Sequence, residues 1–201
     1  MRRVLVLTML SLALPLSLWG SGIDLTNQNG SISILTTGIT SKGSQLNGFN
    51  GIMAPSGHAL GSVSFSTGAL MSGSIATGGT FSSMGSSFMV IGKGNFGQPK
   101  GVIFSGAFVG PIVWTLVSQQ GQGLVFQLSG TIMGTLSNGK VVSGTTVQTI
   151  FTAQTQLAGG VAHIREGMTQ VAIPEPSTLG LLGTGLLGIS GVVRRKLALK
   201  I

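Results

Sequence analysis

Short β-prone runs separated by glycine-rich turns fill the middle of the chain, and this pattern limits what it can fold into. The runs cover residues 31–36, 60–66, 68–76, 86–91, 101–108, 112–119, 123–133 and 144–153. Many of them alternate with a period of two, as expected of strands with one buried face. Asn138-Gly139 separates two runs and predicts a hairpin with a type I′ turn. We therefore predict an all-β fold, an antiparallel β-sandwich or a barrel-like body.

The apolar residues of these runs define an expected core. Its members are Ile34, Phe49, Val63, Phe65, Ile75, Phe88, Val90, Ile103, Phe104, Trp114, Leu116, Phe126, Leu128, Val147 and Phe151. Methionine is a flexible filler of cores, so Met53, Met71, Met84, Met89 and Met133 are expected to pack there too. Residues 157–170 are ambiguous, although Gly159-Gly160 argues against a helix.

Charge and cysteine content exclude several classes of protein. Only 7% of the residues are charged, three are acidic and none is cysteine, which excludes a coiled coil, a disulfide-stapled domain and a cysteine-ligated metal site. The formal net charge is +8, but six of the eleven basic residues lie at the two extreme ends. The body keeps five basic residues without a cluster, so nucleic-acid binding is not expected.

The first 22 residues have the three parts of a secretory signal peptide. Arg2 and Arg3 precede the apolar residues 4–18, and Gly20-Ser21-Gly22 has the small residues that signal peptidase accepts. We expect a helix over this segment and cleavage after Gly22. An uncleaved anchor is disfavoured, because a bilayer core needs about 20 apolar residues.

The C-terminal segment also has three parts in order. Pro174-Glu175-Pro176 is a rigid extended tripeptide, and an uncharged stretch follows over residues 179–193. This stretch predicts one short apolar helix, and Arg194, Arg195 and Lys196 would hold its end on the cytoplasmic side. The residues expected to lie in the membrane are Leu179, Leu181, Leu182, Leu186, Leu187, Ile189, Val192 and Val193.

This tail resembles the PEP-CTERM sorting signal of exported Gram-negative bacterial proteins. The resemblance covers the Pro-Glu-Pro motif, the apolar helix and the basic end, and it implies processing by exosortase, an integral-membrane protease and transpeptidase. It divides the chain into a signal peptide (1–22), an exported β-rich domain (23–172) and a sorting segment (173–201). It also implies a transient stay in the inner membrane, a final place at the cell surface or outside the cell, and an association with exopolysaccharide and biofilm.

Candidate chemical sites in the body are few. Residues 92–97 match G-x-G-x-x-G, but another strand follows where a dinucleotide site needs a helix, so a turn is expected. His58 is assigned to a loop. His163, Arg165 and Glu166 are the only clustered ionisable residues, and adjacent residues of a strand point to opposite faces. With Asp24 far away in sequence, we expect no catalytic residues, no metal, no cofactor and no enzymatic activity.

The leading hypothesis is a non-catalytic exported protein of the cell surface or extracellular matrix. The alternative is a glycan- or protein-binding, adhesin-like module, which an exposed aromatic residue would favour. Trp114 is expected in the core, and its exposure would support binding. Self-association through uncharged strand edges is a third possibility.

Overall fold

The structure is a computed structural model that describes residues 22–120, 123–152 and 160–172. They lie in one compact unit, Gly22–Ala172. No helix in these ranges is long and apolar enough to cross a membrane. The signal-peptide helix and the C-terminal apolar helix expected from the sequence lie outside the described residues.

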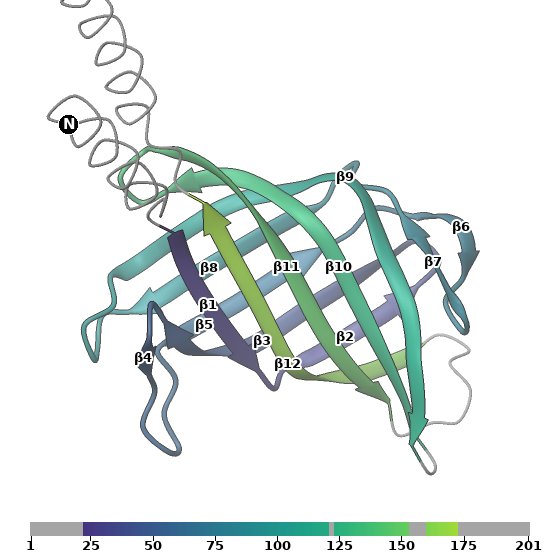
Figure 1. The fold of residues 1–201 in the computed structure, drawn as a ribbon, viewed down its shortest axis with the longest axis horizontal. Coiled ribbons are helices and arrows are strands. Elements are labelled where there is room, and N and C mark those ends of the chain that lie inside the picture. Colours follow the sequence, from purple (N-terminus) through teal and green to yellow (C-terminus); the bar gives the residue numbers. More distant parts are fainter. Residues whose placement is uncertain (1–21, 121–122, 153–159, 173–201) are drawn as a thin grey trace, which may run out of the picture. The chain divides into compact units, whose positions relative to one another are not determined.

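All regular structure in the described ranges is β-sheet (Figure 1). The strands are β1 (Gly22–Gln28), β2 (Ser31–Leu35), β3 (Gly38–Phe49), β4 (Ile52–Met53), β5 (Gly61–Ser66), β6 (Leu70–Ser74), β7 (Gly78–Phe81), β8 (Ser87–Lys93), β9 (Lys100–Gln120), β10 (Gly123–Leu136), β11 (Val141–Thr152) and β12 (Gly160–Ala172).

Eight strands close into an antiparallel barrel. Their order is β10-β11-β12-β1-β3-β5-β8-β9, and β9 pairs again with β10 to complete the ring. The eight strands are arranged around the ring in the order in which they occur along the chain, and the last, β12, pairs with the first, β1. The barrel therefore has an up-and-down topology. This confirms the predicted all-β, antiparallel fold, and of the two expected architectures it is the barrel and not the β-sandwich.

The remaining strands extend the ring. β2 continues β1 between β12 and β3, and the break falls at Asn29 and Gly30, whose φ angles are 60° and 88°. A side chain at Gly30 would overlap the backbone of Ser44, so glycine is required where β1 and β3 approach closely. β4 pairs with β3, while the β6–β7 hairpin continues the sheet along β9 (Figure 1).

The strand boundaries differ from the sequence prediction in several places. β1, β3, β4 and β7 were not expected, and residues 160–170 of the ambiguous segment belong to strand β12. The two runs expected at 101–108 and 112–119 form the single strand β9. The strand continues past Gly110 and Pro111 because these residues lie in a β-bulge. Val109 lies opposite Thr131 and Val113 opposite Ser129, so β9 has extra residues between these two pairs.

The hairpin at Asn138-Gly139 is present, but its predicted turn type is wrong. Gly139 has a φ of 80°, whereas Asn138 is not among the residues with positive φ, which a type I′ turn requires at both positions. The Gly139 amide donates to the carbonyl of Leu136 at 2.9 Å, and the Lys140 amide donates to Asn138 Oδ1 at 3.1 Å. The connection between β10 and β11 is therefore longer than two residues.

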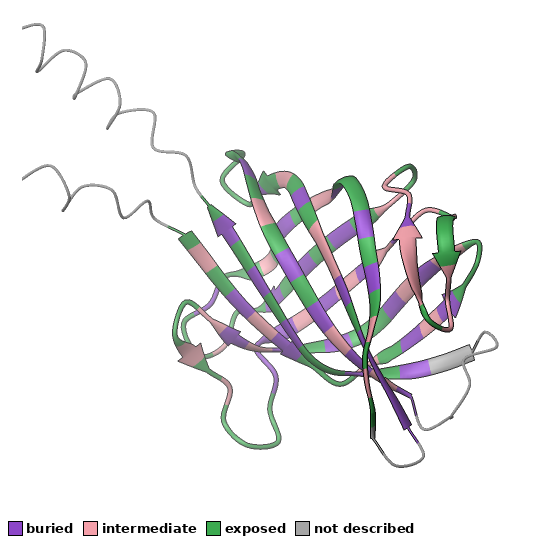
Figure 2. Cartoon of the chain, turned by 45° about the vertical axis from the view of Figure 1, so that its right-hand side comes forward, coloured by how far each residue is buried: buried purple, intermediate pink, exposed green. Residues whose placement is uncertain are grey.

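Side chains fill the barrel interior, and buried and exposed residues alternate along the strands (Figure 2). Phe65, Phe88, Phe104 and Phe108 form an aromatic cluster under β5, β8 and β9, with ring centroids 5.9–6.2 Å apart. Ten of the fifteen expected core residues are buried. The other five, Phe49, Ile75, Leu116, Phe151 and the exposed Val147, are not.

The expectation that methionines fill the core is wrong. Met53, Met71, Met84, Met89 and Met133 are all exposed. Strand parity explains Met89, because its neighbours Phe88 and Val90 both point inward and are fully buried. Phenylalanine, isoleucine, leucine, valine and tryptophan occupy the interior instead.

Candidate functional site

The ionisable side chains of the described residues all lie on the outside of the barrel. They are Asp24, Lys42, His58, Lys93, Lys100, Lys140, His163, Arg165 and Glu166, and each is exposed. No three histidine or acidic side chains within the described ranges come together to hold a metal ion. The ionisable side chains of the described barrel therefore face solvent.

The one ionisable cluster expected from the sequence lies on β12. His163, Arg165 and Glu166 are all exposed, so the expectation that Arg165 and Glu166 point to opposite faces is wrong. A bulge is the reason: Glu166 pairs with Thr149 and Ile164 with Ile150, which leaves Arg165 as the extra residue. The bulge turns three polar side chains to one outer face.

A hydroxyl lies beside this cluster. Ser31 of β2 is the cross-strand partner of His163, and both side chains are exposed. A nucleophile and its base need a hydrogen bond within about 3.2 Å. Among the described side chains, no hydrogen bond joins Ser31, His163 and Glu166. The three groups form an open polar surface on the wall of the barrel.

Two loops meet at the end of the barrel that carries β4. His58 lies in the loop between β4 and β5, as expected, and its ring contacts the ring of Phe96 edge-on at 5.9 Å. Phe96 lies in the loop between β8 and β9, is 45% exposed and has a φ of 58°. Left-handed backbone is costly for an aromatic residue and often marks a functional position.

The glycine motif in this second loop forms a turn, as predicted. β8 ends at Lys93 and β9 begins at Lys100, with no helix between them. The buried Gln98 fastens the loop, since its Nε2 donates to the Leu60 carbonyl and to Asn95 Oδ1. The sequence reading missed Phe96, although its position between Asn95 and Gly97 in a glycine-rich turn was a usable signal for exposure.

A buried polar cluster lies inside the barrel where β1, β3, β11 and β12 meet. Asn27 Nδ2 donates to Ser44 Oγ at 2.7 Å and to Gln148 Oε1 at 2.9 Å. Gln148 Nε2 donates to Thr146 Oγ1 at 2.9 Å, and that hydroxyl lies 2.9 Å from Thr169 Oγ1. Each of these buried side chains has a hydrogen-bond partner within the cluster, so the cluster links the four strands through their side chains.

This polar cluster could not be predicted from the sequence. The sequence pattern assigned Val147 to the core, whereas the residues on either side of it, Thr146 and Gln148, are fully buried. Thr146 and Gln148 are polar, so the apolar periodicity of the sequence did not place them at inward positions of β11. Their partners Asn27 and Ser44 are distant in sequence and lie in strands that were not expected.

Trp114 is 1% exposed, as expected for a core residue. Its ring stacks on Phe126 with centroids 4.5 Å apart, and its Nε1 donates to the Ile75 carbonyl at 2.9 Å. The tryptophan therefore provides no exposed binding surface.

The sorting residues lie outside the described residues, but the strand next to them is defined. Pro174, Glu175 and Pro176 follow two residues after Ala172, the last residue of β12. Ala172 pairs with Gly22, the expected cleavage position and the first residue of β1. The polypeptide therefore enters and leaves the barrel at two adjacent positions. The apolar residues 179–193, Arg194, Arg195 and Lys196 also lie beyond the described ranges.

Comparison with protein families identifies the C-terminal segment. A family model, the PEP-CTERM protein-sorting motif, matches residues 172–196, which include the Pro-Glu-Pro tripeptide and the basic end. Comparison with curated proteins and with solved structures finds no match. The chain is therefore a protein with a PEP-CTERM sorting motif, which indicates export, sorting to the cell envelope and processing by exosortase.

Proposed function

We propose that the barrel is a non-catalytic component of the cell surface or extracellular matrix of a Gram-negative bacterium, where it associates with exopolysaccharide in biofilm. The observation that carries this proposal is the position of the sorting motif, which begins at the last residue of a closed barrel. The predicted signal peptide would start export. Residues 179–193 would hold the chain in the inner membrane until exosortase acts near residues 174–176.

The placement of the ionisable groups supports a role without catalysis. Acid–base chemistry depends on acids and bases whose surroundings tune them, and such groups are usually buried or paired in a cleft. Asp24 and Glu166, the two acidic residues of the barrel, are both exposed on its outer wall. Neither has a neighbouring acid across the strands, since Asp24 pairs with Gln170 and Glu166 with Thr149.

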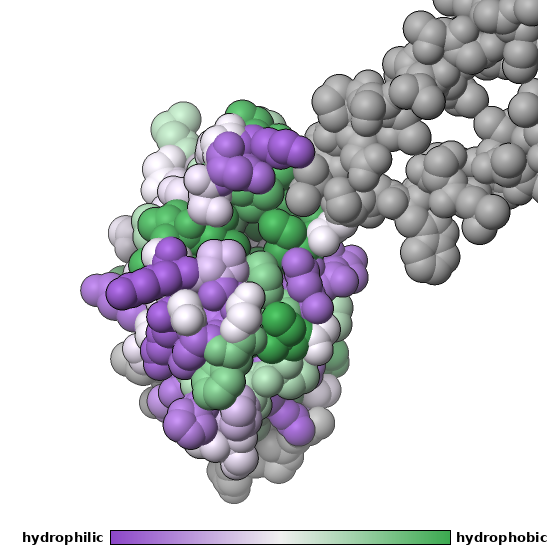
Figure 3. Space-filling view, turned by 90° about the vertical axis from the view of Figure 1, so that its left-hand side faces the viewer, coloured by the Kyte–Doolittle hydropathy of each residue, from purple (hydrophilic) through white to green (hydrophobic). Residues whose placement is uncertain are grey.

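The outer wall offers hydroxyl groups to a polysaccharide. Thr131 lies opposite Thr145, and Thr135 lies opposite Ser105, all with exposed side chains on β9, β10 and β11. Hydroxyls both donate and accept hydrogen bonds, as sugar hydroxyls do. Figure 3 shows hydrophilic side chains scattered among hydrophobic ones on one end of the molecule. Many weak contacts along a long polymer can add to useful avidity.

Cosedimentation with exopolysaccharide tests this proposal. The processed protein is recovered from the envelope and mixed with polysaccharide purified from the same cells. We expect the protein to pellet with the polymer, and Thr131→Val with Thr145→Val to lower the bound fraction several-fold. Thr36→Val with Thr37→Val is the matched control, because those exposed threonines lie in the turn between β2 and β3. Equal binding by both variants, or none by the wild type, would refute the proposal.

A second candidate function is a glycan- or protein-binding module. The specific observation is Phe96, an exposed aromatic ring on strained backbone beside His58. Aromatic rings that present a face to solvent are common anchors for such partners. Phe96→Ala would then abolish binding to a glycan array or to envelope proteins. Met84→Ala, in the turn between β7 and β8, would leave binding unchanged.

A further inference from the structure

Every methionine in the described ranges has an exposed side chain. The exposed fractions are 36% for Met89, 48% for Met133, 51% for Met168, 57% for Met71, 62% for Met53 and 85% for Met84. Methionine is ordinarily among the residues most often buried. Six exposed methionines and no methionine in the interior of the described barrel therefore call for an explanation.

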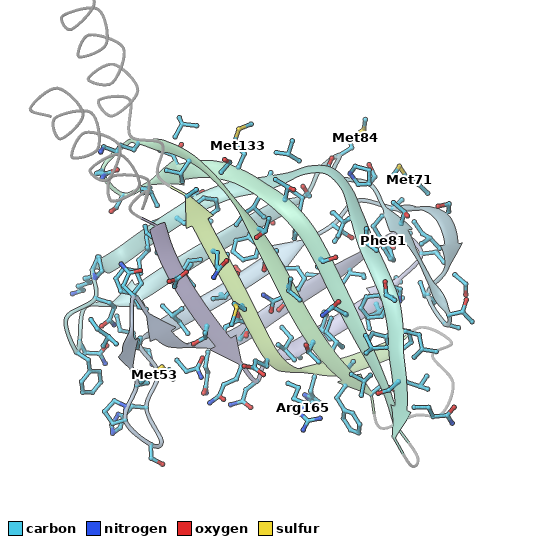
Figure 4. The ribbon with its side chains drawn as sticks, viewed as in Figure 1. Met53, Met71, Phe81, Met84, Met133 and Arg165 are labelled. Atoms are coloured by element: carbon cyan, nitrogen blue, oxygen red, sulfur yellow. The ribbon has the colours of Figure 1, made fainter. Side chains whose placement is uncertain are left out.

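These methionines are spread over the molecule. Met89, Met133 and Met168 are outward positions of β8, β10 and β12, while Met53 belongs to β4 and Met71 to β6. Figure 4 shows Met71, Met84 and Met133 projecting along one side of the barrel and Met53 projecting near the other end. A protein-binding surface would gather its methionines in one patch. The observed spread instead exposes each methionine to solvent separately.

Few other groups on this protein react readily with oxidants. The chain has no cysteine and no tyrosine. Trp114, the tryptophan of the barrel, is 1% exposed. Small oxidants in the medium would therefore react first with the six methionine side chains, because the rate of thioether oxidation depends on the exposure of the side chain.

We propose that the six methionines form an oxidant-consuming surface, which peroxide or hypochlorous acid converts to sulfoxides while the barrel stays folded. With hydrogen peroxide, the sulfur lone pair attacks one oxygen, an S–O bond forms and the O–O bond breaks. The sulfur loses two electrons, and the second oxygen leaves as water after proton transfer. One equivalent of oxidant is consumed at each methionine.

The barrel should remain folded after its methionines are oxidised. A sulfoxide is polar, so its formation in a core would disrupt packing. Here the interior consists of other apolar residues, such as Phe65, Phe88 and Trp114, and the sulfoxides would form in water. Oxidation would therefore change the surface chemistry and leave the interior packing intact.

Mass spectrometry of the oxidised protein tests the site assignment. The processed protein from the envelope is treated with graded hydrogen peroxide and examined by peptide mapping and circular dichroism. We expect one added oxygen at each of the six methionines, fastest at Met84 and slowest at Met89, with an unchanged β-sheet spectrum. The proposal fails if any of the six stays unmodified while free methionine is fully oxidised, or if the spectrum collapses as the oxygens are added.

An oxidant titration tests the capacity with matched variants. One variant replaces all six methionines with leucine. The control replaces six exposed valines with leucine, namely Val102, Val109, Val113, Val117, Val141 and Val147. The methionine variant should consume six fewer equivalents of hypochlorous acid per chain than the wild type and should no longer protect a methionine-dependent reporter enzyme. The valine variant should match the wild type, and equal consumption by all three proteins would overturn the proposal.

Discussion

The side-chain amides of Asn27 and Gln148 exchange two hydrogen bonds inside the barrel, although the residues are 121 positions apart. Asn27 Nδ2 donates to Gln148 Oε1 at 2.9 Å, and Gln148 Nε2 donates to Asn27 Oδ1 at 3.3 Å. Both residues are cross-strand partners of Gly167 on β12. Because Gly167 has no side chain, the two amides meet over it and join β1 to β11.

Removing one amide should destabilise the barrel. Gln148→Leu leaves Asn27 without one of its buried partners, and an unpaired buried polar group costs about 1–3 kcal/mol. We therefore expect the free energy of unfolding, measured by urea denaturation, to fall by about 2 kcal/mol. Gln127→Leu is the control, because Gln127 is an exposed residue of the neighbouring strand β10. Equal losses in the two variants would contradict a role for the amide pair.

Adding a methyl group at Gly167 should break the same pair. Its Cβ would overlap both amide oxygens, so the side chains must move apart. Gly167→Ala should lower the unfolding free energy by about 1–3 kcal/mol. In a Gln148→Ala background only the overlap with Asn27 Oδ1 remains, and the same change should cost less. If the losses of unfolding free energy from the two substitutions simply add, the added methyl group is not accommodated by movement of Gln148, and the prediction is wrong.

Because the backbone at Phe96 is left-handed, glycine should be more stable than alanine at this position, the reverse of the order at an ordinary strand position. An L-residue pays about 1–2 kcal/mol in this conformation, and glycine does not. Phe96→Gly should therefore unfold at a higher urea concentration than Phe96→Ala. The order should reverse at Thr115, an exposed strand position on β9 where glycine is the poorer residue. If alanine is the more stable residue at both positions, the turn is not strained.

Trp114 should report on the packing between β9 and β10. Trp19 would leave with the predicted signal peptide, so emission from the processed protein would come from Trp114 and should be blue-shifted by burial. Trp114→Ala should cost about 3–5 kcal/mol of unfolding free energy. Trp114→Phe should cost less, because a ring can still stack on Phe126 while the hydrogen bond to the Ile75 carbonyl is lost. Solvent-like emission would contradict the buried position.

Period-two patterns predicted the fold class but not which face of each strand points inward. Met89 and Val147 are apolar and still lie outside, because Phe88 and Val90 or Thr146 and Gln148 occupy the inward positions. Two inward residues of β11, Thr146 and Gln148, are polar, and pairing with the distant Thr169 and Asn27 makes their burial favourable. Composition alone cannot reveal such a partner.

Local irregularities were the second obstacle. A single extra residue at Arg165 reverses the parity of β12, so Arg165 and Glu166 share a face that strict alternation denies them. The bulge at Gly110 and Pro111 likewise joins two expected strands into one. The sorting tail was easier to recognise, because its parts follow one another in sequence and need no tertiary partner.

The pairing of β1 with β12, in which Ile23 lies opposite Val171, sets the timing of folding. If the predicted N-terminal signal peptide starts export, the edge of β1 that pairs with β12 stays unpaired until β12 has emerged. Contacts between such distant segments form slowly, since a long loop must close first. β12 is the last barrel strand to emerge and the one that closes the ring, and only Ile173 separates its end from Pro174. The barrel can therefore be completed only when the sorting motif is about to leave the export channel.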